Sequence, residues 1–492
     1  MANVGEIMRR GADLHRQGRL DEARRCYQQV LARDPKQFDA THLSGLIWLQ
    51  GGAPDRAEPL LRCAVELRPD IADVHLNLGK ALGTLGKLDE AITCCHQALR
   101  LHPGHGNARA DLAQWTLDAA ARDADAALAR DDLPAAQAAV DTVVGMAANL
   151  RNRGLSFRLA LAYLRQGRLD DATAALLAPV HRLHDPDGAL PPPVEPFATT
   201  SRAKLVHDIE QFRYLRARGV LGADYDRVIA DYRAVLDGLP RTPGGQHVLT
   251  EAERQRLGPS YDRLVYLAPA PALAAGALNP DLDGPALEAA FHNLPPGIVW
   301  FDDFLRPEAL TSLNRFCLES TIWWQLAFSN ELGTAIRNGF ACPLILQIAE
   351  ELRALLPGLL ADLEVRTIWA YKYYRTDSGL AMHADDGAVS LNFWLTPDAA
   401  NLDPDSGGLL FWDHTQAPVG YFDTDDHGEK LRLLEQALAA TPDAREHTLP
   451  YGQNRAALFN SKVLHKTDAM RFDDGYENRR VNVTMIFGEL RR

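Results

Sequence analysis

A histidine and an aspartate stand two positions apart at His383 and Asp385, and a second histidine, His465, follows far along the chain. One histidine and one carboxylate from a single turn, with a distant second histidine, form the facial triad that holds ferrous iron and leaves coordination positions open. The triplet alone is weak evidence, because 16 histidines and 65 acidic residues should give about two His-x-acid triplets by chance. Two occur, and the other is His427–Glu429. Whether His383 and Asp385 are metal ligands must therefore be judged from the secondary-structure elements that surround them.

Strand-like segments surround the three residues. They are Val365–Tyr374, Val389–Leu395, Ala456–Phe459 and Val481–Phe487. Because strands place alternate residues on one face, Arg480, Asn482 and Thr484 point the same way. An arginine directed into a β-core requires an anion. Alternation favours Arg480 over its neighbour Arg479 for this role, and the sequence leaves both open.

From about Ile298 to Leu490 the residues quoted above resemble the prolyl 4-hydroxylase-like branch of the 2-oxoglutarate oxygenases. The resemblance implies a double-stranded β-helix, or jelly-roll, flanked by helices. It also implies Fe(II) on His383, Asp385 and His465, with 2-oxoglutarate as cosubstrate. A zinc hydrolase is the competing interpretation of the triad, but it would need a general base beside an open water and gives the arginine no role.

The same resemblance assigns the 2-oxoglutarate pocket. Arg480 matches the family's basic residue that binds the far carboxylate, with Asn482 two positions on. Tyr374 stands where the family commonly has a tyrosine in the cosubstrate pocket, and Ser406–Leu410 resembles the glycine turn into the next core strand. The spacing from the second histidine to the basic residue is longer than in many prolyl hydroxylases.

Other residues on these strands are candidates for the pocket wall or for contacts to the metal ligands. They are Tyr371, Asn392 and Trp394. Aromatic residues at strand positions are more often ordinary core, so core packing is the alternative for Trp394.

The N-terminal part of the chain carries a repeat in which four columns recur three times in register. They are Gly11, Gly45 and Gly79; Gly18, Gly52 and Gly86; Ala23, Ala57 and Ala91; and Pro35, Pro69 and Pro103. Helices approach closely only where side chains are small, and proline ends a helix by removing its backbone donor. The pattern resembles the tetratricopeptide family, in which each unit is two antiparallel helices stacked on their neighbours.

In this family, positions on the first helix of each unit often face a concave groove that receives extended peptides. His42, Asp73, Asn77 and Lys80 fall on such positions. The alternative is that each is a solvated helix residue. The lysine and asparagine set that grips chaperone tails is not evident, so a chaperone carboxylate is not the expected ligand.

Composition along the chain indicates four regions and a multidomain α+β fold class, with an all-α solenoid followed by strands flanked by helices. We predict a tetratricopeptide domain over 1–183, with regular units at 4–37, 38–71 and 72–105 followed by irregular units. A proline-rich linker over 184–200, a helical bridging region over 201–295 and the oxygenase domain over 296–492 complete the division.

Charge and hydropathy exclude several classes of partner. With 52 basic against 65 acidic residues the net charge is −13, and no Lys/Arg block stands out, so nucleic acid is not an expected partner. The N-terminus lacks a signal-peptide pattern, and the most apolar stretch, Leu267–Leu278, is short and broken by prolines. We expect a cytoplasmic protein without a membrane segment.

Together these patterns predict an oxygenase that hydroxylates a peptide or protein side chain recruited by the repeats. Peptide-binding helical repeats joined to such an oxygenase resemble the layout of collagen-type prolyl hydroxylases. The first alternative is the same chemistry on a small-molecule or sugar-linked substrate, with the repeats as a docking or oligomerisation scaffold. The second is a non-enzymatic scaffold, against which the intact set of candidate ligands argues. The sequence does not identify the substrate, the hydroxylated atom or the oligomeric state.

Overall fold

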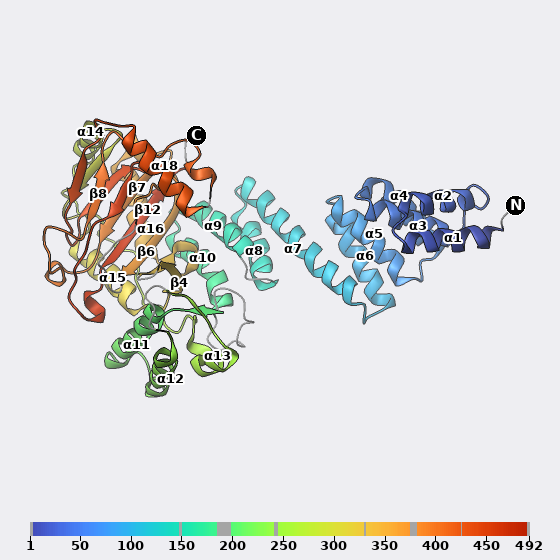
Figure 1. The fold of residues 1–492 in the computed structure, drawn as a ribbon, viewed down its shortest axis with the longest axis horizontal. Coiled ribbons are helices and arrows are strands. Elements are labelled where there is room, and N and C mark those ends of the chain that lie inside the picture. The colour runs from blue at the N-terminus through green and yellow to red at the C-terminus, as the bar shows by residue number, and fades with distance from the viewer. Residues whose placement is uncertain are drawn as a thin grey trace. The chain divides into compact units, whose positions relative to one another are not determined.

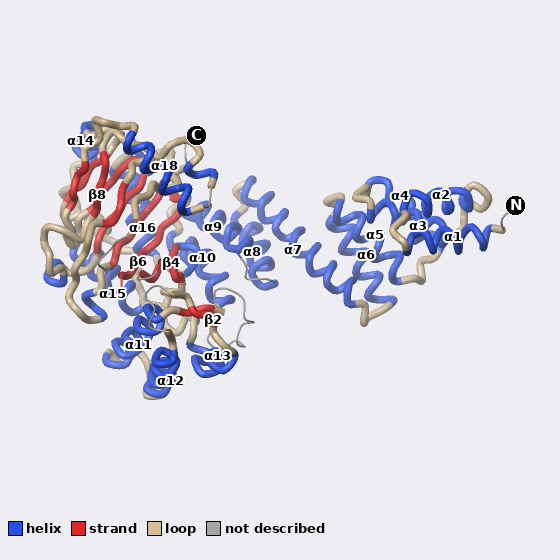
Figure 2. The backbone as a smooth tube through the Cα atoms, in the orientation of Figure 1, coloured by secondary structure: helices blue, strands red, loops and turns tan. Residues whose placement is uncertain are grey.

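The computed structural model describes residues 3–146, 150–184, 198–240, 245–328, 331–373, 381–424 and 426–489. They form two compact units that divide between residues 147 and 148. The first unit is helical, and the second combines helices with antiparallel sheets, as the ribbon in Figure 1 and the red strands in Figure 2 show. None of the helices in these ranges combines the length and the apolar character that crossing a membrane requires.

Helices of the first unit stack as antiparallel pairs. Those described are α1 (Val4–Arg16), α2 (Leu20–Leu31), α3 (Phe38–Gln50), α4 (Pro54–Leu67), α5 (Ala72–Thr84), α6 (Leu88–Leu101), α7 (Gly106–Ala129) and α8 (Leu133–Met146). Each odd-numbered helix packs against the next even-numbered one, and each pair packs against the following pair. The recurring Ala23, Ala57 and Ala91 are fully buried between helices. The predicted helical repeat array is confirmed.

The two glycine columns have different physical causes. A Cβ atom at Gly11 would lie 2.6 Å from the Tyr27 ring, because paired helices touch there. Gly18, Gly52 and Gly86 instead lie in open space with φ of +74°, +72° and +75°. This left-handed conformation is easy for glycine and strained for other residues. Close helix approach therefore explains the first column, and extending that reason to the second column was wrong.

A further helical hairpin opens the second unit. It consists of α9 (Leu150–Arg165) and α10 (Leu169–Leu183), with Gly167 between them at φ +70°, as in the repeats. Helix α10 packs against α16 (Pro343–Leu355), which belongs to the β-sheet region. Most of the predicted linker over 184–200 lies outside the described residues. Its end forms β1 (Thr199–Thr200), which pairs with β2 (His247–Val248).

Helices between this hairpin and the sheets form a small core of their own. They are α11 (Arg202–Ala217), α12 (Tyr225–Gly238) and α13 (Glu251–Leu257). A further helix, α14 (Gly284–Asn293), packs against the first strand of the sheet region instead. Within α11, the buried Lys204 pairs with Asp208 at 2.5 Å, and it also lies 3.3 Å from Asp262. Half-buried Glu210 of the same helix pairs with buried Arg479 of the sheet region. A buried charge is tolerated only when it is paired, so the Glu210–Arg479 pair ties α11 to the sheet region.

Two antiparallel sheets form the C-terminal region. The larger has the strand order β3 (Ile298–Phe301), β10 (Ala456–Asn460), β7 (Val389–Trp394), β12 (Val481–Phe487), β6 (Val365–Tyr373), β5 (Glu331–Ala335) and β4 (Gln325–Phe328). The smaller has the order β11 (His465–Thr467), β8 (Leu409–Trp412) and β9 (Glu446–Leu449). Helices α15 (Pro307–Glu319), α16, α17 (Pro357–Leu360) and α18 (His427–Ala439) flank the strands. The region is therefore a mixed α/β domain with antiparallel sheets.

One core cluster contains side chains from both sheets, which shows that the sheets face each other. Trp394 of β7 and Phe459 of β10 meet Leu409 and Phe411 of β8 in this cluster. Such inward-facing alternate residues are the usual core of two packed sheets. The loops and strand ends beside this core carry the histidines.

Candidate metal centre

His383, Asp385 and His465 come together at one end of the two sheets. His383 donates its backbone N–H to the His465 carbonyl at 2.9 Å, and His465 donates in return at 3.0 Å. The Asp385 N–H donates to the Ser461 carbonyl at 2.8 Å. The chain segments that carry the three side chains are thus fixed to each other through their backbones. This explains how residues so far apart in sequence share one site.

The side chains are arranged as one set of ligands. His383 Nε2 lies 3.9 Å from Asp385 Oδ1, and His465 Nε2 lies 3.9 Å from Asp385 Oδ2. One ligand atom from each residue lies within 4.8 Å of the others. In a facial set the ligand atoms are neighbours at about 90°, so bonds of about 2.1 Å place them about 3.0 Å apart. The three side chains must therefore move closer together, by roughly 1–2 Å per pair, to share one ion. The three residues form a candidate metal site.

Hydrogen bonds orient both imidazoles and the carboxylate. His383 Nδ1 lies 2.8 Å from the Ala381 carbonyl, and His465 Nδ1 lies 3.0 Å from the Val463 carbonyl. A carbonyl accepts only from a protonated nitrogen, so Nδ1 carries the proton and Nε2 keeps its lone pair for a metal. Ser390 donates to Asp385 Oδ2 at 2.7 Å.

The electrostatics of the site favour a neutral, metal-binding histidine. Burial, and to a smaller extent the neighbouring His383, lower the pKa of His465 to about 4, although Asp385 acts in the opposite direction. The imidazole is therefore uncharged at neutral pH. Metal binding requires this neutral form, so no proton has to be displaced from His465 near pH 7.

A cavity of about 220 Å³ adjoins the three residues. Its wall consists mainly of polar and aromatic side chains from the larger sheet: Trp369, Tyr371 and Tyr373 of β6, Asn392 of β7, and Asn482 and Thr484 of β12. Asn482 donates to Thr484 at 3.1 Å, and Thr484 donates to Asn392. Asn482 Oδ1 makes no hydrogen bond to a described residue. The cavity therefore offers polar groups beside the candidate metal ligands.

Arg480 immediately precedes β12 and is fully buried, and the alternation of the strand places it on the same side as Asn482 and Thr484. Its Nε donates to the Gly407 carbonyl at 2.8 Å and its Nη2 to the Gly408 carbonyl at 3.4 Å, whereas Nη1 has no hydrogen-bond partner among the described residues. The guanidinium lies 4.9 Å from the centroid of the Tyr373 ring, which lines the cavity. Burial lowers its pKa. An unpaired buried cation of this kind fits an anionic ligand.

Arg479 points elsewhere. It forms its ion pair with Glu210 of α11 and contributes to the contact between that helix and the sheet. Arg479 therefore already has a carboxylate partner. The other triplet, His427–Glu429, opens α18, where Glu429 pairs with Arg432 on the surface.

Some of the remaining predicted pocket residues line the cavity and others do not. Tyr371 and Asn392 line the cavity together with Asn482. Tyr374 lies outside the described residues. Trp394 is not part of the cavity wall: it is fully buried in the core between the sheets, with Arg480 5.6 Å from its ring centroid. Trp394 thus has the core position that the sequence analysis gave as its alternative.

Two contributing residues escaped the sequence analysis. Ser390 lies on the same face of β7 as Asn392, so alternation could have found it. Glu331 is opposite Tyr373 in the β5–β6 register and is only 4% exposed, with Oε1 unpartnered among the described residues. Burial raises its pKa to about 7, although Tyr373 and Arg480 act in the opposite direction. No sequence pattern marked Glu331.

In the first unit, the predicted groove residues form contacts between successive repeats. Asn77 of α5 lies 2.9 Å from His42 Nε2 of α3, and Asp73 lies 2.9 Å from His105 Nε2 at the start of α7. Lys80 lies 3.8 Å from Asp111 of α7. These side chains thus form one polar row across the first helices of the units.

Comparison with known families identifies the repeats. A tetratricopeptide repeat model matches residues 8–72 and 121–180, and a second tetratricopeptide repeat model matches residues 72–105. No curated protein matches the chain. The protein therefore combines an N-terminal tetratricopeptide region with a C-terminal β-sheet domain that carries a candidate His-Asp-His metal site.

Several solved structures are similar over part of the chain. The first tetratricopeptide domain of Spaghetti (RPAP3) bound to an HSP90 peptide is 24% identical, covers 24% of this chain and 93% of its own, and has a TM-score of 0.23. A mutant O-GlcNAc transferase of Thermobaculum terrenum is 29% identical over 25% of this chain and 28% of its own, with a TM-score of 0.22. MamA protein is 20% identical over 38% of this chain and 98% of its own, with a TM-score of 0.25.

Proposed function

We propose that the protein is an Fe(II)- and 2-oxoglutarate-dependent oxygenase with a double-stranded β-helix core, and that it hydroxylates a peptide or protein side chain recruited by the tetratricopeptide region. One observation carries the proposal: the His383, Asp385 and His465 set lies on the wall of a cavity that Tyr373 also lines, and the ring of Tyr373 lies beside the buried Arg480. The test is a gain of one oxygen, detected by mass spectrometry, in lysate proteins and peptides incubated with enzyme, iron and 2-oxoglutarate in air.

The donor atoms fit ferrous iron. Two neutral imidazoles and one carboxylate form the set that non-haem iron oxygenases use, and three ligands leave positions open for other groups. Zinc accepts the same donors. Arg480 favours iron, because the oxygenase reaction needs a dicarboxylate beside the metal and a zinc hydrolase does not.

The Tyr373 end of the cavity fits the far carboxylate of 2-oxoglutarate. Arg480 has a free Nη1 and is held rigid by the Gly407 and Gly408 carbonyls, so it can donate to a carboxylate without first being reoriented. Asn482 offers a polar contact close by. With iron and 2-oxoglutarate bound, the site would supply an oxidant strong enough for an unactivated C–H bond. The chain's own residues bind and orient these groups and keep bulk water out.

Glu331 should make 2-oxoglutarate binding dependent on pH. Its carboxyl lies near Arg480 and has a pKa raised to about 7 by burial. Below about pH 7 the group is neutral, and above it a carboxylate competes with 2-oxoglutarate for the same arginine, since one cation cannot neutralise two anions. We expect the KM for 2-oxoglutarate to rise as pH increases through 7 in the wild type and to stay flat in Glu331→Gln. Steady-state titrations across this range measure it, and equal profiles would contradict the role.

Peptide recruitment by the repeats rests on the polar row across α3, α5 and α7. Tetratricopeptide arrays commonly receive extended peptides on such a surface, and this makes a protein partner the favoured substrate. A small-molecule substrate would leave the row without a function in catalysis.

A pair of histidine variants tests recruitment. His42 belongs to the row, whereas His96 is exposed on α6, outside it. Loss of one contact worth about 1 kcal/mol should raise the KM of the hydroxylated protein about fivefold in His42→Ala and leave turnover without substrate unchanged. His96→Ala is the matched control. Equal KM values for the two variants would favour the reading in which the repeats are a scaffold.

A further inference from the structure

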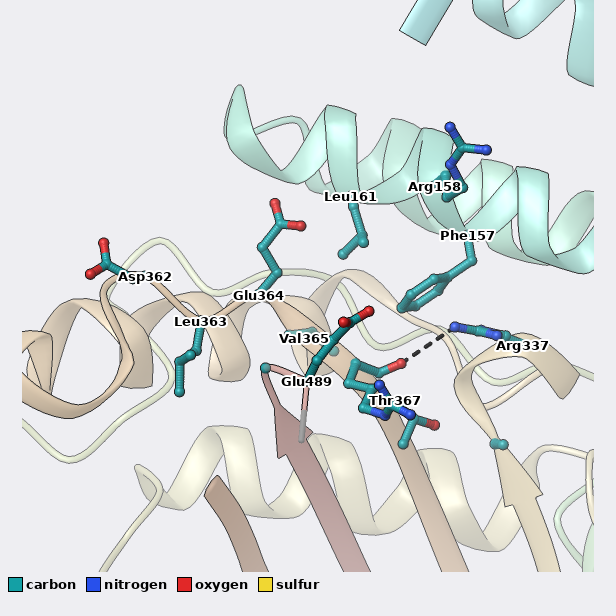
Figure 3. A pocket seen from close by; sticks show the side chains of 13 residues that line it. Phe157, Arg158, Leu161, Arg337, Asp362, Leu363, Glu364, Val365, Thr367 and Glu489 are labelled. Carbon is teal, nitrogen blue, oxygen red and sulfur yellow. Dashed lines mark hydrogen bonds between the residues drawn. The ribbon is translucent and has the colours of Figure 1, made fainter. Parts of the chain in front are cut away.

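A second, larger cavity of about 680 Å³ lies in the same unit. Helix α9 covers it from one side, and Figure 3 shows Phe157 and Leu161 of that helix pointing towards the strands. Its other walls come from residues 362–367 at the start of β6, from Arg337 of the short η2 helix (Ile336–Asn338), and from the end of β12. None of these residues belongs to the candidate metal centre.

The two cavities follow one another along β6. Thr367 lines the larger cavity, and Trp369, Tyr371 and Tyr373, which lie on the same face of the strand, line the smaller one. A register shift in the β6–β12 pairing leaves Arg366 without a partner residue on β12. Arg366 lines the larger cavity and pairs at 2.5 Å with Asp386, which lines the smaller. This ion pair stands at the boundary between the two spaces.

The order of residues along β6 indicates from which end of the smaller cavity a second substrate would enter. Tyr373 and the nearby Arg480 mark the end of the metal cavity that fits a dicarboxylate, so another substrate must approach from the opposite end, at Trp369 and Asp386. The larger cavity lies beyond that end along β6. From Tyr371 to Thr367 is four residues of strand, or about 13 Å, which an extended peptide also spans in about four residues.

Arg337 gives the larger cavity a cation without a carboxylate partner. Its guanidinium lies 4.0 Å from the Phe157 ring centroid, and its Nη2 donates to the Arg366 carbonyl at 3.5 Å (Figure 3). Burial and the nearby Arg366 lower its pKa. Among the residues that the structure describes, no carboxylate forms an ion pair with Arg337. Arg337 is nevertheless exposed to solvent, so an acidic ligand group can reach this guanidinium, which stacks on the Phe157 ring.

The acidic residues of this cavity do not replace such a ligand. Glu364 already pairs with Arg165 of α9 at 2.6 Å. Figure 3 shows Asp362 and Glu364 on the side of the cavity away from Arg337, and Glu489 between Glu364 and Arg337. No ion pair joins Glu489 to Arg337 among the described residues. An acidic ligand group is therefore attracted to Arg337 and repelled from the Asp362 side, which restricts the position at which it binds.

We propose that the larger cavity is the binding subsite for an acidic side chain of an extended peptide, located about four residues from the side chain at the metal. That such a peptide is a substrate rests on the proposed oxygenase function, whereas its binding in the larger cavity does not. The proposal narrows the substrate class to peptides with a glutamate or aspartate at a fixed distance from the hydroxylated residue.

The test uses the full-length protein without iron or 2-oxoglutarate, so its result does not depend on catalysis. Immobilised protein is incubated with mixtures of ten-residue peptides in which one position at a time is fixed as Glu, Gln or Lys, and bound peptides are quantified by mass spectrometry. The variant is Arg337→Glu. The matched control is Arg227→Glu, because Arg227 of α12 is 92% exposed and lies outside the cavity.

Wild type and Arg227→Glu should retain peptides with Glu at one position at least about tenfold better than the Gln counterparts, as expected for a charge-assisted contact. Arg337→Glu should lose this preference or change it to Lys. Equal retention of Glu and Gln peptides by the wild type would overturn the subsite, as would an unchanged Glu preference in Arg337→Glu. Peptide selection without any gain of oxygen in the enzyme assay would instead refute the oxygenase function and leave the subsite intact.

Discussion

The double variant His383→Ala/Asp385→Ala should lose both bound iron and 2-oxoglutarate turnover. The wild type is expected to bind one ferrous ion per chain, because His383, Asp385 and His465 supply one ligand set. Removal of two ligands leaves a single imidazole, which cannot hold the ion. Loss of residues that merely support a ligand already weakens metal sites about 10- to 100-fold, so the loss here should exceed 100-fold. Metal analysis after anaerobic loading and a succinate assay measure the two effects.

His292→Ala is the control for this variant, since His292 is exposed on α14 and takes no part in the site. It should keep wild-type iron content and turnover. Full iron content in the double variant would show that the metal lies elsewhere. Zinc retained in place of iron, with hydrolytic activity, would favour the competing zinc chemistry.

The sequence allowed the ligand set and the arginine face to be predicted because their signals are local or periodic. His383 and Asp385 share one turn, and Arg480, Asn482 and Thr484 alternate along one strand. Predicting that His465 lies at the same site required only the assumption that its strand belongs to the same β-core. The backbone pairing of His383 with His465 confirms that they meet.

Features that depend on tertiary packing could not be read in the same way. Trp394 alternates with Ser390 and Asn392, yet the opposite sheet covers it, and no sequence pattern states where that sheet ends. The hairpin α9–α10 keeps the turn glycine of the repeats but packs against α16, so its unit depends on a partner distant in sequence. Glu331 acts through burial beside Tyr373, and burial of a single acid leaves no periodic signal.

Arg480→Ala should raise the 2-oxoglutarate requirement strongly and leave iron binding nearly intact. The side chain is fully buried, has Nη1 free and lies beside Tyr373 of the cavity wall. Among the described residues, no hydrogen bond or ion pair joins it to His383, Asp385 or His465. Truncating one partner of a buried charged pair costs on the order of 2–5 kcal/mol, so 2-oxoglutarate binding should weaken well beyond tenfold.

Arg479→Ala is the matched comparison, because this neighbouring arginine pairs with Glu210 and anchors α11. It should lower the free energy of unfolding, since the half-buried Glu210 loses its partner, while the KM for 2-oxoglutarate changes little. Titration of both variants with 2-oxoglutarate, together with thermal denaturation and iron analysis, separates the two roles. A large KM change in Arg479→Ala combined with a normal KM in Arg480→Ala would transfer carboxylate binding to Arg479. That outcome would require α11 to release its ion pair when 2-oxoglutarate binds, because one guanidinium cannot serve both carboxylates in the arrangement seen here.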